Sequence, residues 1–320
     1  MSSDDMSQGA PSHERWWAWR VLKLGWHLLL NYGSLLQLVR LLRLAPFFEA
    51  CRYNPRFALK SLGQNYLARN LDARARLDCF IYHYERVRSS FPDHTLKMLL
   101  YWDIPLYEMT EEGHKFSLDL GSSRPYDKEG ELSLLLKVDS LIIFTLTFTI
   151  IPAWVVGSCA ADALLISRLQ GERSCPDEIR LATKAMSGVR PRALLLAALQ
   201  GIAYALGVEE IDAVSAREQT SYCGHSESSF LSSYDEFFAE LGLKKNSSGF
   251  FSSRVPIPEK PLMLVDPNNR RTARKKQAFK GQIQMACAAS LGQACGQTRG
   301  CLEFRLPQAS EENTLEASTL

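Results

Sequence analysis

A strand, a helix and a second strand between residues 162 and 214 place the strongest constraint on how this chain folds. Ala163–Leu169 is a short apolar run with the composition of a strand, and Gln170-Gly171 follows it. Ala193–Leu206 is apolar over the length of a helix and ends before Gly207, and Val208–Ser215 predicts the next strand. This order predicts a crossover in which the helix packs on the sheet that contains both strands.

The helix of this unit begins with positive charge. Arg190 and Arg192 flank Pro191, a residue that favours the first turn of a helix. The partial positive charge of a helix N-terminus disfavours arginine there unless an anion lies nearby. The sequence therefore predicts a phosphate site at Arg190 and Arg192. The alternative is a solvated loop in which these arginines pair with Glu172 or Glu178.

Two strands that precede this unit are predicted to form a hairpin. Glu131–Val138 and Leu141–Ile151 are separated by Asp139-Ser140, which indicates a tight turn. Phe144–Ile150 alternates apolar residues with threonine, and this period of two favours a strand over a transmembrane helix in the uncharged stretch. A meander followed by a crossover predicts an α+β fold, with a mixed or antiparallel sheet and helices packed on it.

The first hundred residues have a different character, because they are helical in pattern and basic. They hold 14 Lys and Arg against 8 Asp and Glu. Helices are predicted at Arg15–Ala50, Phe57–Tyr66 and Asp72–Arg88. The prediction divides the whole chain into a disordered leader (1–14), a helical basic module (15–105), an α+β domain (106–265), a basic helix (266–284) and a poorly ordered tail (285–320).

Composition limits the classes of protein and of partner. The hydrophobic share of 46% is that of a globular protein with a sizeable core, and the net charge of +2 implies no obligate polyanion partner. The eight cysteines form no C-x-x-C pair, so neither a metal site nor a disulfide framework is predicted. The apolar stretch Leu24–Val39 is short for a bilayer span and is interrupted by polar residues. These features predict a cytoplasmic protein.

Several short stretches, in order along residues 40–280, resemble the VirK/YbjX family of Gram-negative bacterial proteins. That resemblance implies a link to virulence, to resistance against antimicrobial peptides, or to the assembly of outer-membrane and surface proteins. The tail from about residue 281 departs from the basic-aromatic helix that the resemblance implies. The matching stretches include Arg52-Tyr53-Asn54-Pro55, Tyr66-Leu67-Ala68, His83-Tyr84, Gly130-Glu131-Leu132, Leu169-Gln170-Gly171, Gly188-Val189-Arg190-Pro191, Tyr234-Asp235-Glu236-Phe237, Gly249-Phe250-Phe251 and Arg274-Lys275-Lys276.

The meander and crossover also resemble the core of the GNAT-type acyltransferases. This second resemblance implies coenzyme A or an acyl carrier protein as acyl donor, with Arg190 and Arg192 holding phosphate while Gln170 and Gly171 shape the acyl slot. A plain turn is the alternative for Gln170 and Gly171. The chain departs from that family because the Q/R-x-x-G-x-G/A loop is absent and Glu172–Val189 separates the strand from the helix.

Two residues are candidate general bases for such a reaction. His225 lies in a polar segment near Cys223, and histidine titrates near neutral pH. Glu131 stands at a strand start, where a charged edge residue is the ordinary alternative. His83 falls among aromatic residues on a predicted helix, and we interpret it as a structural histidine.

A non-enzymatic adaptor at the inner membrane face is the alternative function. The tryptophan-rich stretch Arg15–Trp26 and the basic run Arg270–Lys280 predict contact with an anionic membrane surface or another envelope component. Only Phe279 interleaves the basic run, so no specific nucleic-acid partner is predicted.

Overall fold

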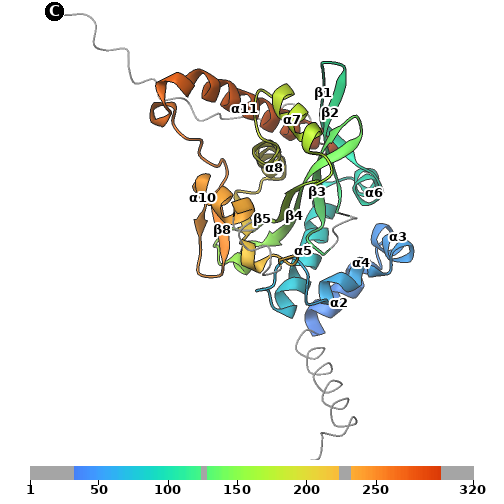
Figure 1. Ribbon diagram of the computed structural model, residues 1–320. Helices are drawn as coiled ribbons and strands as arrows, with labels where there is room; N and C mark the ends of the chain where they lie inside the picture. Colours follow the sequence, from blue (N-terminus) through green and yellow to red (C-terminus); the bar gives the residue numbers. More distant parts are fainter. Residues whose placement is uncertain (1–31, 124–127, 223–231, 297–320) are drawn as a thin grey trace, which may run out of the picture.

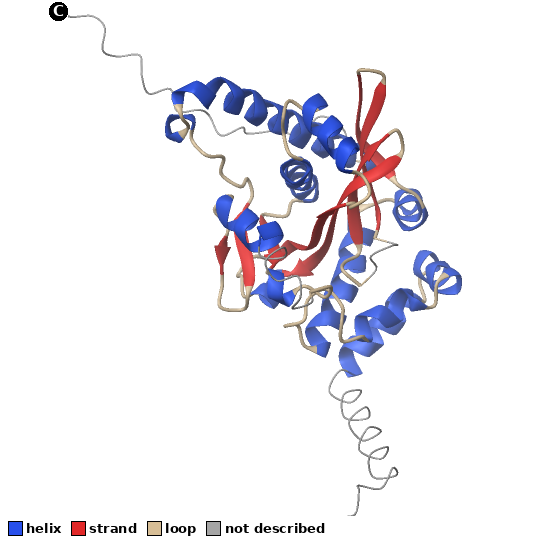
Figure 2. Cartoon of the chain, in the orientation of Figure 1, coloured by secondary structure: helices blue, strands red, loops and turns tan. Residues whose placement is uncertain are grey.

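The computed structural model describes residues 32–123, 128–222 and 232–296. The predicted leader (1–14), the tryptophan-rich stretch Arg15–Trp26, the candidate base His225 and residues 297–320 of the tail lie outside this part. The described residues confirm an α+β fold, in which helices cover both faces of one open sheet (Figures 1 and 2).

The sheet of the described chain has eight strands in the order β1-β2-β3-β4-β5-β6-β8-β7. All neighbouring strands are antiparallel except β5 and β6, which are parallel. The strands are β1 (Ile104–Glu111), β2 (His114–Ser122), β3 (Leu132–Val138), β4 (Leu141–Pro152), β5 (Asp162–Gly171), β6 (Glu210–Val214), β7 (Lys244–Lys245) and β8 (Phe250–Arg254).

Tight turns connect β1 to β2 and β3 to β4. Asp139 and Ser140 join β3 to β4 with φ values of 48° and 72°, which confirms the predicted hairpin and its turn. The stretch Phe144–Ile150 lies within β4, as its alternation predicts. Among the described residues, no helix is both long enough and apolar enough to cross a membrane.

The crossover unit is also present, with one difference at the end of its first strand. Leu164–Ile166 pairs in parallel with Ile211–Ala213, and the long helix α8 (Pro191–Leu206) connects the two strands. Gln170 and Gly171 do not form a turn after β5, because they are its last residues and pair with Thr145 and Phe144 of β4.

The N-terminal module differs in detail from its predicted helices. The long helix expected to reach Ala50 is broken after Leu42, and Pro46 occupies the first turn of the next helix, where a missing N–H is tolerated. The helix expected at Phe57–Tyr66 ends at Leu59 and continues only as a short 3₁₀ turn. The helices are α2 (Tyr32–Leu42), α3 (Ala45–Tyr53), α4 (Arg56–Leu59), α5 (Ala73–Ser90) and α6 (Asp93–Tyr101).

The predicted boundary between a basic helix and a poorly ordered tail, at residues 284 and 285, is wrong. The helix α11 (Arg270–Ala294) continues without a break across this boundary. Its residues Ile283, Cys287 and Leu291 are buried at four-residue spacing. This face packs on α8, where Gly201 lets the two backbones approach closely. A Cβ at Gly201 would collide with the carbonyl oxygen of Gln284.

Replacing either of two glycines on these packed helices by alanine should therefore change the stability of the protein in opposite directions. Gly201→Ala should lower the free energy of unfolding by about 1–3 kcal/mol, because the added methyl forces α8 and α11 apart. Gly281→Ala should raise it by about 0.5–1 kcal/mol, because a Cβ at Gly281 meets no atom within 4 Å and alanine is the better helix former. Urea unfolding measures both. Equal effects of the two substitutions would contradict this packing of α11.

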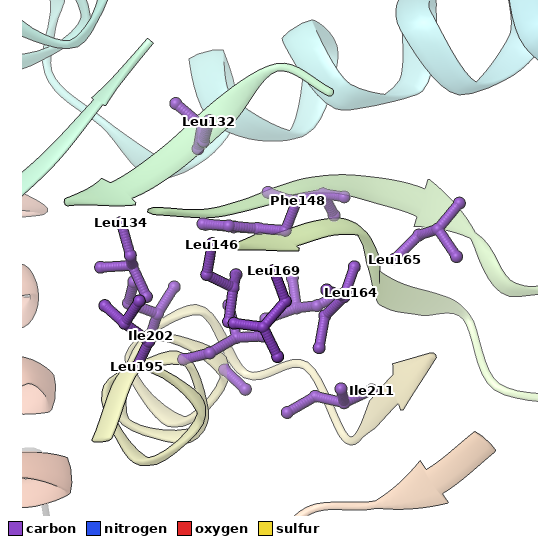
Figure 3. Close-up of a cluster of buried hydrophobic side chains, with 14 of the residues drawn as sticks. Leu132, Leu134, Leu146, Phe148, Leu164, Leu165, Leu169, Leu195, Ile202 and Ile211 are labelled. Atoms are coloured by element: carbon purple, nitrogen blue, oxygen red, sulfur yellow. The ribbon is translucent and has the colours of Figure 1, made fainter. Parts of the chain in front are cut away.

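The core lies between the sheet and α8. Figure 3 shows Leu195 and Ile202 of α8 pointing at Leu134 and Leu146 of the sheet. Each such side chain contributes roughly 1.5–3 kcal/mol by leaving water. On the other face, α5 packs against β4. The helix α7 (Pro176–Ala185) contacts α8, and the helix α10 (Phe237–Glu240) lies near the N-terminal end of α8, where Arg192 lies over the ring of Phe237.

Candidate functional site

A pocket opens at the N-terminal end of α8. It has a volume of about 720 Å³, which lies within the usual range for small-molecule sites. All four residues predicted to bind a cofactor (Gln170, Gly171, Arg190 and Arg192) line it. We call it the α7–α8 pocket; its lining is completed by Phe144, Leu169, Ile179, Arg180, Thr183, Lys184, Gly188 and Pro191.

The floor of the α7–α8 pocket is formed where β4 begins and β5 ends. Gly171 pairs with Phe144, and a Cβ on Gly171 would lie 2.9 Å from two carbons of the Phe144 ring and 3.2 Å from Ile179. Glycine at this position thus lets the aromatic ring and α7 close over the end of β5. The result is an apolar floor beneath a basic rim.

The rim is set by the connection between α7 and α8. Ser187 and Gly188 both have left-handed backbone conformations, with φ of 56° and 74°, and they turn the chain back toward α8. Arg190 is the N-cap of α8 but supplies no capping hydrogen bond, and Pro191 follows it. Arg190 is exposed, whereas Arg192 is half-buried with its guanidinium 4.7 Å from the centre of the Phe237 ring.

The charge of the α7–α8 pocket is of one sign. Arg180, Lys184, Arg190 and Arg192 line it, and no carboxylate does. Arg180 pairs with Asp177 and Lys184 pairs with Glu112, both at 2.8 Å and both outside the lining.

Within the described part of the chain, Arg190 and Arg192 form no ion pair, so the alternative pairing with Glu172 or Glu178 is not found. Two uncompensated guanidinium groups at a helix N-terminus are suited to an anion.

The candidate base Glu131 does not reach this pocket. Its side chain is fully buried, accepts a hydrogen bond from the Tyr66 hydroxyl on Oε1, and accepts others on Oε2 from Tyr84 at 2.5 Å and Lys60 at 2.8 Å. We call these four residues the Glu131 cluster.

Burial, followed by the negative charge of Glu131, raises the pKa values of Tyr66 and Tyr84 well above 10. The two tyrosines therefore remain hydrogen-bond donors to Glu131, which is enclosed by three donors. The predicted role of Glu131 as a base thus has no support in its surroundings.

His83 lies beside the Glu131 cluster and is structural, as predicted. Its Nδ1 accepts a hydrogen bond from the backbone N–H of Ile150 at 3.1 Å. Burial, and then the charge of Lys60, lowers the pKa of His83 to about 3, so the imidazole stays neutral.

No sequence pattern marks the partners of Glu131. Lys60 lies 71 residues before it and has no distinguishing neighbours. One signal could have found the tyrosines, because Tyr66-Leu67-Ala68, His83-Tyr84 and Gly130-Glu131-Leu132 are all stretches on which the family resemblance rests. These stretches meet at one place in the structure.

A second buried carboxyl group lies in the sheet. Asp212 of β6 is fully buried, with Oδ1 accepting from the Ser252 hydroxyl and Oδ2 lacking a partner among the described residues. Burial raises the pKa of Asp212 to about 7, although the hydrogen bond from Ser252 acts in the opposite direction. The described residues hold no group of three or more His, Cys, Asp or Glu side chains that could bind a metal ion.

Comparison with known proteins identifies a family and a relative by sequence, but no solved structure. The model of a family described as "Protein of unknown function (DUF535)" matches residues 14–289. The "Uncharacterized protein YbjX" of Escherichia coli K12 is 26% identical over 241 residues, which span 72% of this chain and 70% of that protein. No solved structure matches significantly. The chain therefore belongs to the DUF535 family and is a distant homologue of YbjX.

Proposed function

We propose that the α7–α8 pocket binds a phosphate-bearing ligand and that this ligand is an acyl donor, coenzyme A or the phosphopantetheine arm of an acyl carrier protein. The observation that carries this proposal is the pair Arg190 and Arg192, which lines a pocket of sufficient size without a carboxylate to neutralise it. Phosphate oxygens match guanidinium groups in charge and hydrogen-bonding geometry.

The arrangement of the sheet supports an acyl donor over a simple phosphate. Parallel pairing of β5 and β6 ends at Ile166 and Ala213, while β5 continues to Gly171 at the pocket. A meander, a crossover and a strand that continues past its parallel partner are the features of the GNAT-type core.

The path of the pantetheine arm is constrained by Tyr234. The backbone N–H of Leu169 donates a hydrogen bond to the Tyr234 hydroxyl at 3.4 Å, so this side chain occupies the space beside β5. We therefore place the phosphates at Arg190 and Arg192 and run the arm over Gln170 and Gly171. The apolar floor at Phe144 and Ile179 would take the acyl end.

The proposal concerns binding and positioning of the donor, with an acceptor in the cell envelope as the family resemblance implies. Among the described lining residues, Thr183 carries the one side-chain hydroxyl, and no carboxylate, imidazole or thiol is present. Glu131 is enclosed in its cluster, and His225 lies outside the described residues. A base for the transfer step is therefore not assigned.

Thermal shift of the full chain tests the proposal. We expect coenzyme A and acyl-coenzyme A to raise the melting temperature, because a ligand at 100 times its Kd stabilises the folded state by about 2.7 kcal/mol. The Arg190→Ala/Arg192→Ala variant should lose the shift. The matched control Arg271→Ala/Arg274→Ala, which removes two exposed arginines from α11, should keep it. Absence of a shift in the wild type, or an identical shift in both variants, would refute the proposal.

A further inference from the structure

Exposed hydrophobic side chains are concentrated on the N-terminal helices. Of the fourteen large hydrophobic residues exposed in the described part of the chain, nine lie between Tyr32 and Trp102. Phe48 is 54% exposed, Leu59 60% and Trp102 70%. Isolated exposed apolar residues are common on soluble proteins, but a concentration of them marks a surface that contacts something.

These residues follow one pattern on three successive helices. Each helix or turn presents an exposed apolar side chain about one turn from an exposed arginine: Leu36 and Arg40 on α2, Phe48 and Arg52 on α3, and Leu59 and Arg56 on α4. We call these six residues the apolar–arginine surface. The same helices also carry the buried residues Leu38, Phe47 and Ala58.

The three helices are neighbours in space. The helix α3 contacts both α2 and α4, and Figure 1 shows the three in a row along the edge of the molecule opposite α11. The apolar–arginine surface therefore lies on helices that form one layer, and it shares no residue with the α7–α8 pocket.

The charge of this layer is strongly one-sided. Residues 32–71 contain six Lys and Arg and a single carboxylate, Glu49, which lies 4.0 Å from Lys97. Lys60 forms its ion pair with Glu131. Arg40, Arg43, Arg52 and Arg56 are exposed and form no ion pair with any residue that the structure describes. A partner of this surface must therefore offer negative charge together with an apolar interior.

We propose that the apolar–arginine surface docks on an anionic lipid bilayer. Guanidinium groups would bind the lipid phosphates, and the leucine and phenylalanine side chains would enter the boundary between head groups and acyl chains. This inference is independent of the ligand pocket. It places the membrane contact on α2, α3 and α4, whereas the sequence predicts it at Arg15–Trp26 and Arg270–Lys280.

Two other occupants fit the surface less well. In a symmetric dimer the same surface would face itself, which would bring unpaired arginines together with only Glu49 to offset them. A single-stranded nucleic acid is held by successive aromatic platforms, whereas Leu36 and Leu59 of this surface are aliphatic. Because Tyr32, Tyr53 and Trp102 are exposed on the same module, the test below includes an oligonucleotide.

Vesicle co-flotation of the full chain tests the proposal. We expect binding to phosphatidylcholine vesicles that contain phosphatidylglycerol, weaker binding at high salt, and little binding to phosphatidylcholine alone. Each arginine near an anionic surface contributes somewhat more than a factor of about five to the binding constant, so the Arg40→Gln/Arg52→Gln variant should bind roughly thirtyfold more weakly than the wild type. Leu36→Gln/Leu59→Gln should also bind more weakly, because the apolar insertion is lost. The control Arg271→Gln/Arg274→Gln should bind like the wild type.

All variants change exposed residues, so their melting curves should match that of the wild type, and this match is checked first. Several results would overturn the proposal. The wild type could fail to float with anionic vesicles, could bind neutral vesicles equally well, or could bind a single-stranded oligonucleotide as tightly as it binds vesicles. Alternatively, both surface variants could bind anionic vesicles like the wild type, or only the α11 control could lose binding. If the variants change self-association in light scattering and leave flotation unchanged, the surface is a dimer interface.

Discussion

Glu131→Gln is expected to lower the free energy of unfolding by about 3–5 kcal/mol, the largest effect of any single substitution considered for this protein. The reason is that Lys60 loses the carboxylate that compensates its buried charge. The side chain of Lys60 is 7% exposed, and its Nζ lies 5.7 Å and 6.0 Å from the ring centres of Phe57 and Phe80. Those rings offset only part of the cost of burying the charge.

A double-mutant cycle separates this pair from simple loss of packing. Lys60→Met alone should also destabilise, because Glu131 then lacks its cation, although Tyr66 and Tyr84 still donate to it. The double variant Lys60→Met/Glu131→Gln should be less destabilised than the sum of the two single variants. Denaturant unfolding followed by circular dichroism measures all three. Strict additivity would contradict a direct charge pair.

The exposed pair Lys115 and Glu108 provides the control for this cycle. Its two side chains are 57% and 50% exposed and lie 2.8 Å apart. Glu108→Gln should change stability little, because water already solvates both charges. The Glu131 cluster joins residues of the N-terminal module to the residue that precedes β3, so we expect wild-type unfolding to be one transition for the module and the sheet. Two separate transitions would argue against that coupling.

Asp212→Asn is expected to stabilise the protein above neutral pH, by up to about 4 kcal/mol. Since the pKa of Asp212 is about 7 in the folded protein and near 4 when unfolded, the folded state holds its proton more tightly. Wild-type stability should therefore fall as the pH rises from about 4 through 7, as the buried carboxyl loses its proton. Asparagine keeps a side-chain oxygen for the Ser252 hydroxyl without acquiring a charge.

The measurement is the free energy of unfolding of both proteins in urea at a series of pH values. The two curves should converge below about pH 4, where Asp212 is protonated in both states, and should separate as the pH rises. The charge of the nearby Glu210 also raises the pKa of Asp212, so this repulsion is part of the expected difference. A constant difference at all pH values, or a less stable asparagine variant at pH 8, would show that Asp212 is not the group responsible.

Local sequence predicted those elements whose signals are local. Asp139-Ser140 predicted the β3–β4 turn, and the apolar run ending at Gly207 predicted α8 and the crossover around it. The β1–β2 hairpin was not predicted, although Phe116, Leu118 and Leu120 alternate with polar residues and Gly113 lies in the turn. Distant contacts complete it, including the pairing of β2 with β3 and the hydrogen bond from Ser290 of α11 to Leu106.

The same distinction holds for the candidate site. Arg190 and Arg192 could be identified from sequence because their charge conflicts with the dipole of the helix that follows them. Lys60 could not be identified in this way, and neither could the contacts of Tyr66 and Tyr84 with Glu131, because these residues come together only when the helices pack on the sheet. For α11, burial of Cys287 and Leu291 against α8 extends the helix beyond the end that its basic residues indicate.

Calorimetric titration of the full chain with coenzyme A at low salt is the most direct test of the central claim that the α7–α8 pocket holds a phosphate-bearing ligand. The account predicts saturable binding by the wild type, retained binding by Arg271→Ala/Arg274→Ala, and no detectable binding by Arg190→Ala/Arg192→Ala. Binding of equal affinity in the wild type and in the pocket variant would contradict it, as would a wild type that takes up no ligand while remaining folded.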